Sequence, residues 1–151
     1  MTKQFFRKAS SEALFFDFTE FHKANPFERR SQAFYEWFLG FAEGDGCYSS
    51  CFDKRYSHLP PRQRVEFYLT QKDPTVLYFV QSQFGFGYVY DRKDGVHVWN
   101  VSKKDHVKLL CLLAKDNVVL PKVRQNLKIW CDYFNLVQCV KPLSSFSLLS
   151  T

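Results

Sequence analysis

The chain has 151 residues, of which 46% are hydrophobic and 19% aromatic, and its formal net charge is +6 at pH 7. This length and composition suffice for one packed core and exclude an intrinsically disordered chain. The longest apolar runs are far shorter than the roughly 20 residues that a membrane-spanning helix needs, so we expect no membrane partner.

The positive charge is unevenly distributed along the chain. Residues 1–46 carry six basic and seven acidic side chains, whereas residues 47–151 carry fifteen basic and eight acidic ones. Such a basic body indicates a polyanionic partner, nucleic acid above all, and solubility alone is the alternative explanation. The five cysteines are odd in number and the sequence shows no secretion signal, which indicates reduced thiols inside the cell.

The first half of the chain predicts two helices followed by two strands. A helical extension is expected over residues 1–30, and a second helix, apolar on nearly all sides, over residues 31–44. After Gly46 the pattern changes to two-residue alternation, which predicts one strand in "CYSSCFDKRY" and another in "RQRVEFYLTQ".

The second half repeats the order of a helix and two strands, and then adds helices. Asp73-Pro74 introduces a short helix, "TVLYFVQSQF", and two strands, "YVYDR" and "VHVWNV", flank a hairpin turn at "KDG". A helix in "HVKLLCLLAK" follows, and Pro121 begins the last helix. The order predicts an α+β fold in which two hairpins form a four-stranded antiparallel sheet with helices on one face.

One face of this sheet is expected to be polar and basic. In the second strand, polar side chains alternate with Val65, Phe67 and Leu69. A two-stranded ribbon of this kind can lie in the major groove of DNA, and an ordinary solvated face is the alternative.

The segment "FLGFAEGDG" (residues 38–46) combines glycines and acids at the end of the second helix. Gly40 and Gly44 lie four residues apart on one helix face, where small residues let another backbone approach. Glu43 and Asp45 lie at the C-terminal end, where the helix dipole disfavours negative charge. A divalent cation would remove this conflict, and pairing of two copies would join both Asp45 carboxylates in a site suited to phosphodiester hydrolysis. An acidic helix end in water is the alternative.

The same nine residues resemble the signature of the LAGLIDADG homing endonucleases. They keep glycine at the third position, acids at the sixth and eighth and the final glycine, with Phe38, Leu39 and Glu43 as mild departures. The similarity runs from about Ser31 to Asn135, where "YLTQKD", "FGFGYVYDR" and "NVVLPKVRQNLKIW" resemble later family segments. The resemblance implies an αββαββα fold with a saddle-shaped sheet over residues 31–138, between the extension over 1–30 and a tail over 139–151.

The resemblance also implies an activity and roles for residues. The chain would be a site-specific endonuclease that cuts both strands of double-stranded DNA with Mg²⁺, for which Mn²⁺ or Ca²⁺ can substitute in binding. Asp45 would hold the metal, helped by the Gly44 carbonyl, while Gln71 would orient water and Lys122 would stabilise charge on the phosphate. In a shifted register, the residues that would replace Lys122 are Lys115 and Arg124.

A single motif implies a homodimer acting on a roughly palindromic target. Its interface is expected to contain Phe38, Gly40, Phe41 and Gly44. Counting by twos along the strands turns Tyr48 and Phe52 toward the core. The same count predicts the DNA-contacting residues, which are Ser49, Cys51, Asp53, Arg55, Arg62, Arg64, Glu66, Tyr68, Tyr90, Arg92 and Asn100.

Two other functions are compatible with the same residues. Some relatives act as splicing helpers (maturases), so an RNA-binding protein without nuclease activity, with intron RNA as its partner, is one alternative. The other is one half of a heterodimeric or split two-motif endonuclease, since the tail resembles the start of a linker. The resemblance further implies an organellar setting, in a mitochondrion or chloroplast.

Overall fold

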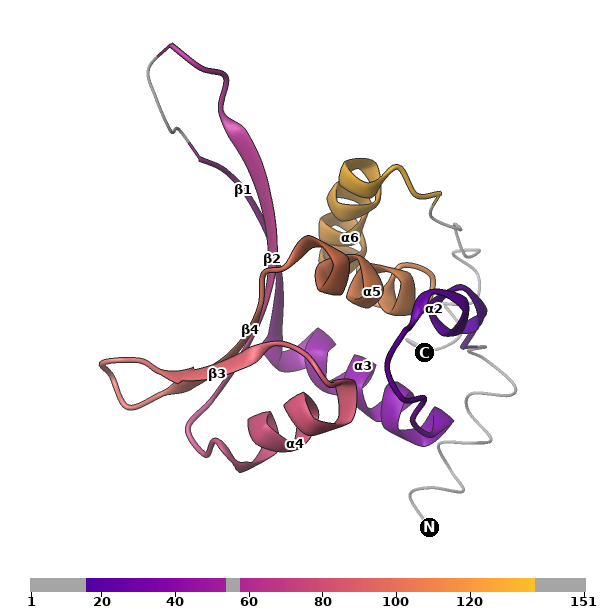
Figure 1. Ribbon diagram of the computed structural model, residues 1–151, viewed down its shortest axis with the longest axis vertical. Helices are drawn as coiled ribbons and strands as arrows, with labels where there is room; N and C mark the ends of the chain where they lie inside the picture. The colour runs from indigo at the N-terminus through magenta and orange to yellow at the C-terminus, as the bar shows by residue number, and fades with distance from the viewer. Residues whose placement is uncertain (1–15, 54–57, 138–151) are drawn as a thin grey trace.

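The computed structural model describes residues 16–53 and 58–137 (Figure 1). Arg55, the tail over 139–151 and the first fifteen residues of the predicted extension lie outside the described residues. The helices are α2 (Thr19–Ala24), α3 (Gln32–Asp45), α4 (Thr75–Phe84), α5 (Lys104–Ala114) and α6 (Pro121–Phe134). The strands are β1 (Gly46–Asp53), β2 (Arg62–Gln71), β3 (Tyr88–Asp91) and β4 (His97–Val101).

The four strands form one curved antiparallel sheet in the order β1-β2-β4-β3. Figure 1 shows the described helices gathered on one side of this sheet, while the outer part of the β1–β2 hairpin projects beyond them. The chain is therefore an α+β protein in which the predicted order of helices and strands is confirmed. None of the described helices has the length and apolar character that crossing a membrane requires.

Helix α3 runs directly into β1, and glycine makes this junction possible. The helix begins after Ser31, whose Oγ accepts a hydrogen bond from the Phe34 N–H at 3.1 Å. At the other end, a Cβ on Gly46 would lie 2.7 Å from the Ala42 carbonyl oxygen and 2.8 Å from the Phe67 ring. Because these contacts exclude any side chain, the last glycine of the motif lets the helix pass into the strand without a loop.

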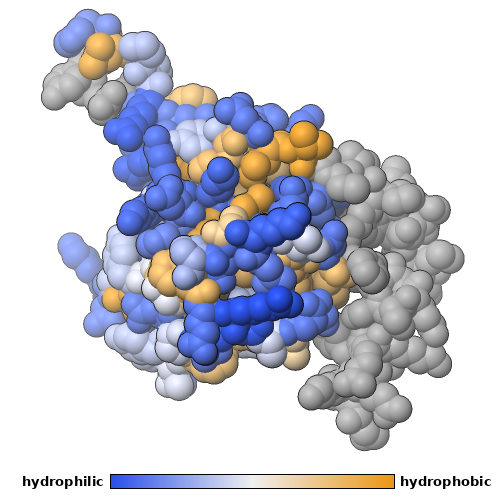
Figure 2. All heavy atoms as spheres, turned by 45° about the vertical axis from the view of Figure 1, so that its right-hand side comes forward, coloured by the Kyte–Doolittle hydropathy of each residue, from blue (hydrophilic) through white to orange (hydrophobic). Residues whose placement is uncertain are grey.

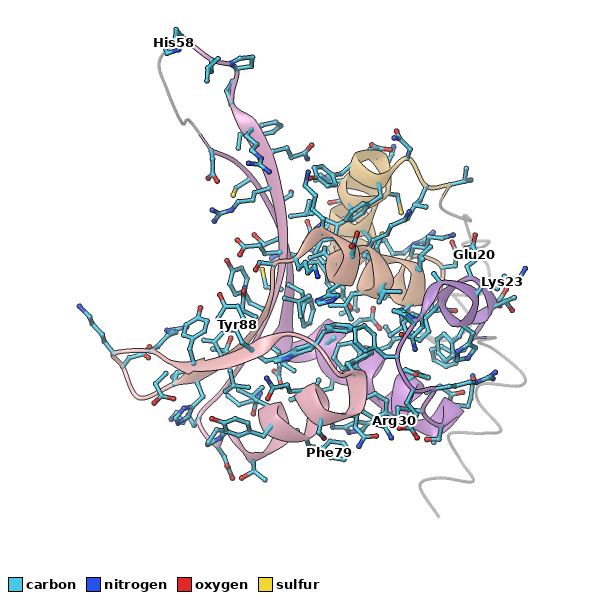
Figure 3. The ribbon with its side chains drawn as sticks, viewed as in Figure 1. Glu20, Lys23, Arg30, His58, Phe79 and Tyr88 are labelled. Carbon is cyan, nitrogen blue, oxygen red and sulfur yellow. The ribbon has the colours of Figure 1, made fainter. Side chains whose placement is uncertain are left out.

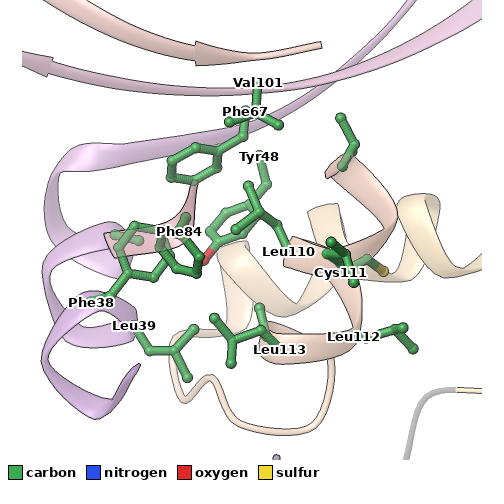
Figure 4. Packing of buried hydrophobic residues seen from close by; sticks show 14 of the residues in the cluster. Phe38, Leu39, Tyr48, Phe67, Phe84, Val101, Leu110, Cys111, Leu112 and Leu113 are labelled. Carbon is green, nitrogen blue, oxygen red and sulfur yellow. The ribbon is translucent and has the colours of Figure 1, made fainter. Parts of the chain in front are cut away.

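An aromatic cluster joins the sheet to α3 and α4. Phe38 meets Phe84 edge to face with ring centroids 4.8 Å apart, and Phe84 stacks on Trp99 at 5.8 Å. Phe67 lies in the same cluster, as the close-up in Figure 4 shows. Trp99 is fully buried and donates from Nε1 to the Phe86 carbonyl at 3.2 Å. This cluster fixes α3 beneath the centre of the sheet.

Helices α5 and α6 cover the part of the sheet nearer to the projecting hairpin. Trp130 of α6 donates from Nε1 to the Ser49 carbonyl at 2.9 Å and packs edge to face on Tyr48. Tyr48 is buried, and burial together with the charge of Glu43 raises the pKa of its hydroxyl. The prediction that Tyr48 points into the core is therefore confirmed.

The prediction for Phe52 is wrong. Its side chain is 69% exposed, although it lies on the same face of β1 as Tyr48. It pairs with Gln63 in the outer part of the β1–β2 hairpin, where the strands extend past the helices (Figure 1). Strand alternation assigned the face correctly, but that face has no helix over it at this position.

Two glycines with the same backbone angle allow a test of how tightly Trp99 is packed. Gly87 and Gly95 both have φ of +81°, which favours glycine. A Cβ on Gly87 would lie 2.4 Å from Trp99 Nε1, whereas nothing lies within 4 Å of a Cβ on Gly95. We expect Gly95→Ala to cost about 1 kcal/mol of unfolding free energy through backbone strain alone. We expect Gly87→Ala to cost about 1–3 kcal/mol more, through overpacking.

Chemical denaturation of both variants measures this difference, and the near-ultraviolet signal of the tryptophans reports whether Trp99 moves. Equal losses in the two variants would contradict the packing argument, because only Gly87 faces the indole.

Candidate functional site

Asp45 occupies an open position at the C-terminal end of α3. Its side chain is exposed, and its Oδ2 accepts a hydrogen bond from Gln71 Nε2 at 3.3 Å. The last turn of α3 holds no basic residue that would offset this charge. The fold thus joins two of the residues predicted to be catalytic, although they lie 26 positions apart.

Glu43, the other acid of the motif, has a different environment. Its Oε1 accepts two backbone hydrogen bonds, from the N–H groups of Val119 and Leu120, each at 2.8 Å. These residues directly precede α6. Glu43 is therefore engaged within the fold, whereas the Asp45 carboxylate faces outward.

The link to Glu43 also places Lys122 at this end of α3. Lys122 is exposed and lies in the first turn of α6, two residues after Leu120. Its alternative Lys115 has a side chain only 4% exposed, and its Nζ is held by Glu20 at 2.7 Å and by the Val137 carbonyl at 2.8 Å. Because Lys115 is buried and already paired, it is excluded as the alternative to Lys122 in the site.

The donor atoms at the end of α3 suit a hard cation, but one chain supplies few of them. Asp45 offers an exposed carboxylate, and the carbonyl of Gly44 belongs to the last turn, where helical carbonyls lack an intrahelical donor. Within residues 16–53 and 58–137, no three His, Cys, Asp or Glu side chains gather in a way that could hold a metal ion. A complete set of ligands would therefore need further oxygens from a second copy, DNA or water.

The strand register places the predicted DNA-contacting side chains on one face of the sheet. Their pairing brings Ser49, Cys51 and Asp53 opposite Glu66, Arg64 and Arg62, and it brings Tyr68 opposite Asn100 and Tyr90 opposite Val98. Because directly paired residues point to the same side, these residues share the face turned away from the helices. Arg92 continues this face beyond β3, where its N–H donates to the Val96 carbonyl.

A chain of polar contacts runs across this face. Arg64 contacts Asp53 at 3.0 Å and Glu66 at 3.1 Å, and the Tyr68 hydroxyl donates to Glu66 at 2.7 Å. Burial and the bond to Glu66 raise the pKa of Tyr68, so its hydroxyl stays a donor. The guanidinium of Arg64 thus contacts two carboxylates of this face at once.

Two positions on this face differ from the sequence-based assignment. Asn100 is only 1% exposed and its Oδ1 has no hydrogen-bond partner among the described residues, so direct contact with DNA is contradicted for this side chain. Tyr88, which was not predicted, is 52% exposed, pairs with Asn100 and lies 5.7 Å from Tyr90 between ring centroids (Figure 3). Continuing the alternation back from Tyr90 would have found it.

The side of α3 that is turned away from the core is open to solvent and carries exposed aromatic residues. Gly40 and Gly44 are exposed, and a Cβ on either would meet nothing within 4 Å. Beside them, Trp37 is 41% exposed and stacks on Phe41 at 5.4 Å, while Phe79 of α4 is 47% exposed and meets Trp37 at 6.0 Å. We call Trp37, Gly40, Phe41, Gly44 and Phe79 the glycine face.

Phe38 does not belong to the glycine face, so the prediction that it lies in a dimer interface is wrong. It is only 1% exposed and packs on Phe84 and Phe67 inside the chain. Two residues along a helix turn by about 200°, which puts Phe38 on the side opposite Gly40. Trp37 takes the outward position instead.

The face that Figure 2 shows is largely hydrophilic. In Figure 2 hydrophilic side chains cover much of the visible face, and apolar ones reach the surface as a group in the upper part of the body. Apolar exposure in separate groups is common on protein surfaces and by itself indicates no site.

Comparison with known proteins gives three kinds of match. A family model described as LAGLIDADG endonuclease matches residues 38–135. A probable intron-encoded endonuclease of Neurospora crassa is 30% identical over 104 residues, which make up 66% of this chain and 17% of that protein. One from Schizosaccharomyces pombe is 26% identical over 132 residues, or 79% of this chain and 33% of that protein. The chain thus spans a third or less of these two relatives.

Solved structures share the fold. The homing endonuclease I-CvuI, in complex with the I-CreI target in 2 mM Mg, is 22% identical with a TM-score of 0.55, covering 69% of this chain and 67% of that one. The meganuclease I-AabMI, bound to uncleaved DNA, is 24% identical with a TM-score of 0.58, covering 66% of this chain and 36% of that one.

Proposed function

The chain belongs to the LAGLIDADG endonuclease family, and from this premise we propose that it is a site-specific homing endonuclease. It acts as a homodimer on a long, roughly palindromic stretch of double-stranded DNA, and it hydrolyses one phosphodiester bond in each strand. An organellar intron is the expected genomic setting. The observation that carries this proposal is the exposed Asp45 at the end of α3, between the glycine face and the polar face of the sheet.

DNA lies along the polar face of the sheet in this proposal. Arg62, Arg64 and Arg92 supply positive charge to phosphates or guanine edges, and Tyr88 and Tyr90 offer further donors. Because Asp53 and Glu66 hold Arg64 in place, its remaining N–H groups are oriented before DNA arrives. The basic charge after residue 46 adds affinity that does not depend on sequence.

The reacting phosphate lies at the end of α3. Asp45 and the Gly44 carbonyl would hold a divalent cation, which when bound supplies Lewis-acid stabilisation of negative charge on phosphate oxygens. Gln71, whose amide already contacts Asp45, orients the attacking water. Lys122, in the first turn of α6, stabilises charge developing on the phosphate.

Pairing of two copies completes the site. The glycine face lets the α3 helices of two chains approach closely, which brings both Asp45 carboxylates to the two-fold axis. Two half-sites, one for each chain, then give a target with two-fold symmetry.

A second candidate rests on the length of the relatives. This chain covers 36% of I-AabMI and 17% of the Neurospora crassa protein. One half of a larger two-motif endonuclease would use the same Asp45 and the same glycine face, but its partner would be a different unit.

Cleavage of a randomised DNA library tests the proposed function. With Mg²⁺ we expect double-strand cuts whose flanking sequences are enriched in two-fold symmetric patterns, and with a chelator we expect none. Ca²⁺ is expected to support binding with little cleavage. A chain that binds structured intron RNA but cuts no DNA with any of these ions would act as a maturase, and this result would refute the nuclease.

A further inference from the structure

The carboxylate of Glu43 joins two segments of chain that lie far apart in sequence. Its Oε1 accepts the N–H groups of Val119 and Leu120, which are 76 and 77 positions away, and both distances are 2.8 Å. The other oxygen, Oε2, takes part in neither bond. A single oxygen atom thus ties the end of α3 to the start of α6.

The start of α6 needs such an acceptor. Leu120 occupies the N-cap position without a side-chain capping bond, and Pro121 occupies the first turn. The first N–H groups of a helix have no intrahelical acceptor, and the helix dipole favours negative charge there. Glu43 therefore caps α6 from another helix, and this contact also offsets its unfavourable place at the C-terminal end of α3.

The position of this contact has a consequence for the cleavage site. Asp45 follows Glu43 by two residues, and Lys122 follows Leu120 by two residues, so the contact is the short link between them. We propose that Glu43 is a positioning residue, which holds the start of α6 so that Lys122 reaches the phosphate beside Asp45. This inference rests on the proposed function, because it assumes that Lys122 acts on the phosphate.

Other contacts hold the start of the loop that joins α5 to α6. Lys115 binds Glu20 of α2, which is labelled in Figure 3, at 2.7 Å. The Asn117 side chain accepts from the N–H of Asp17 at 2.8 Å and donates to its carbonyl at 2.9 Å. These anchors do not involve Glu43. Removing the Glu43 contact should therefore loosen the start of α6 while the rest of the loop stays in place.

Two substitutions at position 43 separate positioning from charge. Glu43→Gln keeps an Oε1 acceptor for both N–H groups and removes the charge, whereas Glu43→Ala removes the acceptor. For Glu43→Ala we expect single-turnover cleavage to fall about 10- to 100-fold with little change in DNA affinity, because a misplaced group slows the chemical step. For Glu43→Gln we expect a rate within about threefold of the wild type. Hydrogen exchange at the Val119 and Leu120 amides should speed up in Glu43→Ala alone.

A double-mutant cycle with Lys122→Ala tests whether Glu43 acts through Lys122. We expect the double variant Glu43→Ala/Lys122→Ala to be no slower than Lys122→Ala alone. Fully additive losses would overturn the inference, as would a Glu43→Gln variant as slow as Glu43→Ala, since that result would assign the role to the charge. If the wild type cuts DNA and Glu43→Ala cuts it at the wild-type rate, the positioning role of Glu43 is overturned while the proposed function stands. A wild type that cuts nothing refutes the proposed function itself, while amide exchange still tests the contact.

Discussion

Replacing Asp45 with asparagine is expected to abolish DNA cleavage and to leave DNA binding nearly unchanged. Asparagine has the same shape and can keep a hydrogen bond to Gln71, which now donates to Asp45 Oδ2 at 3.3 Å. It removes the negative charge that a divalent cation requires. We expect the cleavage rate to fall by about 10³-fold or more, a loss typical for groups that stabilise charge at a reacting centre. Binding should persist, since the sheet face supplies most contacts in the proposed complex.

Asp53→Asn is the matched control. The Asp53 carboxylate lies on the polar face of the sheet, away from the end of α3. It pairs with Arg64 at 3.0 Å in the projecting hairpin. Its replacement should alter affinity or base preference and leave the rate of cutting a bound target nearly unchanged. Cleavage rates and dissociation constants measured on one target for both variants decide the question, and equal cleavage by wild type and Asp45→Asn would refute the assigned role.

The order of helices and strands could be predicted because each element carries a strong local signal. β2 alternates Val65, Phe67 and Leu69 with polar residues, and all three apolar side chains are buried. Pro121 marks the start of α6, and Gly46 marks the end of α3. Such signals depend on neighbours within a few residues, so they can be recognised without knowledge of the tertiary structure.

The incorrect assignments depend on what covers a residue rather than on its own strand or helix. Phe52 and Asn100 lie on the faces that alternation predicts, yet Phe52 is exposed where the helices end and Asn100 is buried. Helical phase could have separated Phe38 from Gly40, because the two point to opposite sides of α3. The contact between Glu43 and Leu120 spans 77 positions and has no local sequence signal.

Replacing Gly40 with leucine is expected to separate the proposed homodimer into monomers that do not cut DNA. Within the chain, a Cβ at this position meets nothing within 4 Å, and leucine is a better helix former than glycine by about 1 kcal/mol. The monomer should therefore fold at least as well as before. Between two α3 helices, however, a leucine side chain would hold the backbones apart and separate the Asp45 carboxylates.

Sedimentation velocity, thermal unfolding and cleavage of the selected target measure these effects together. Lys108→Leu serves as the control, because it adds the same side chain at an exposed position of α5, away from the glycine face. A Gly40→Leu variant that stays dimeric would show that the chains associate elsewhere. A wild-type chain that sediments as a monomer would instead favour the second candidate, one half of a two-motif endonuclease. In that case the open glycine face would bind a different unit rather than a second copy.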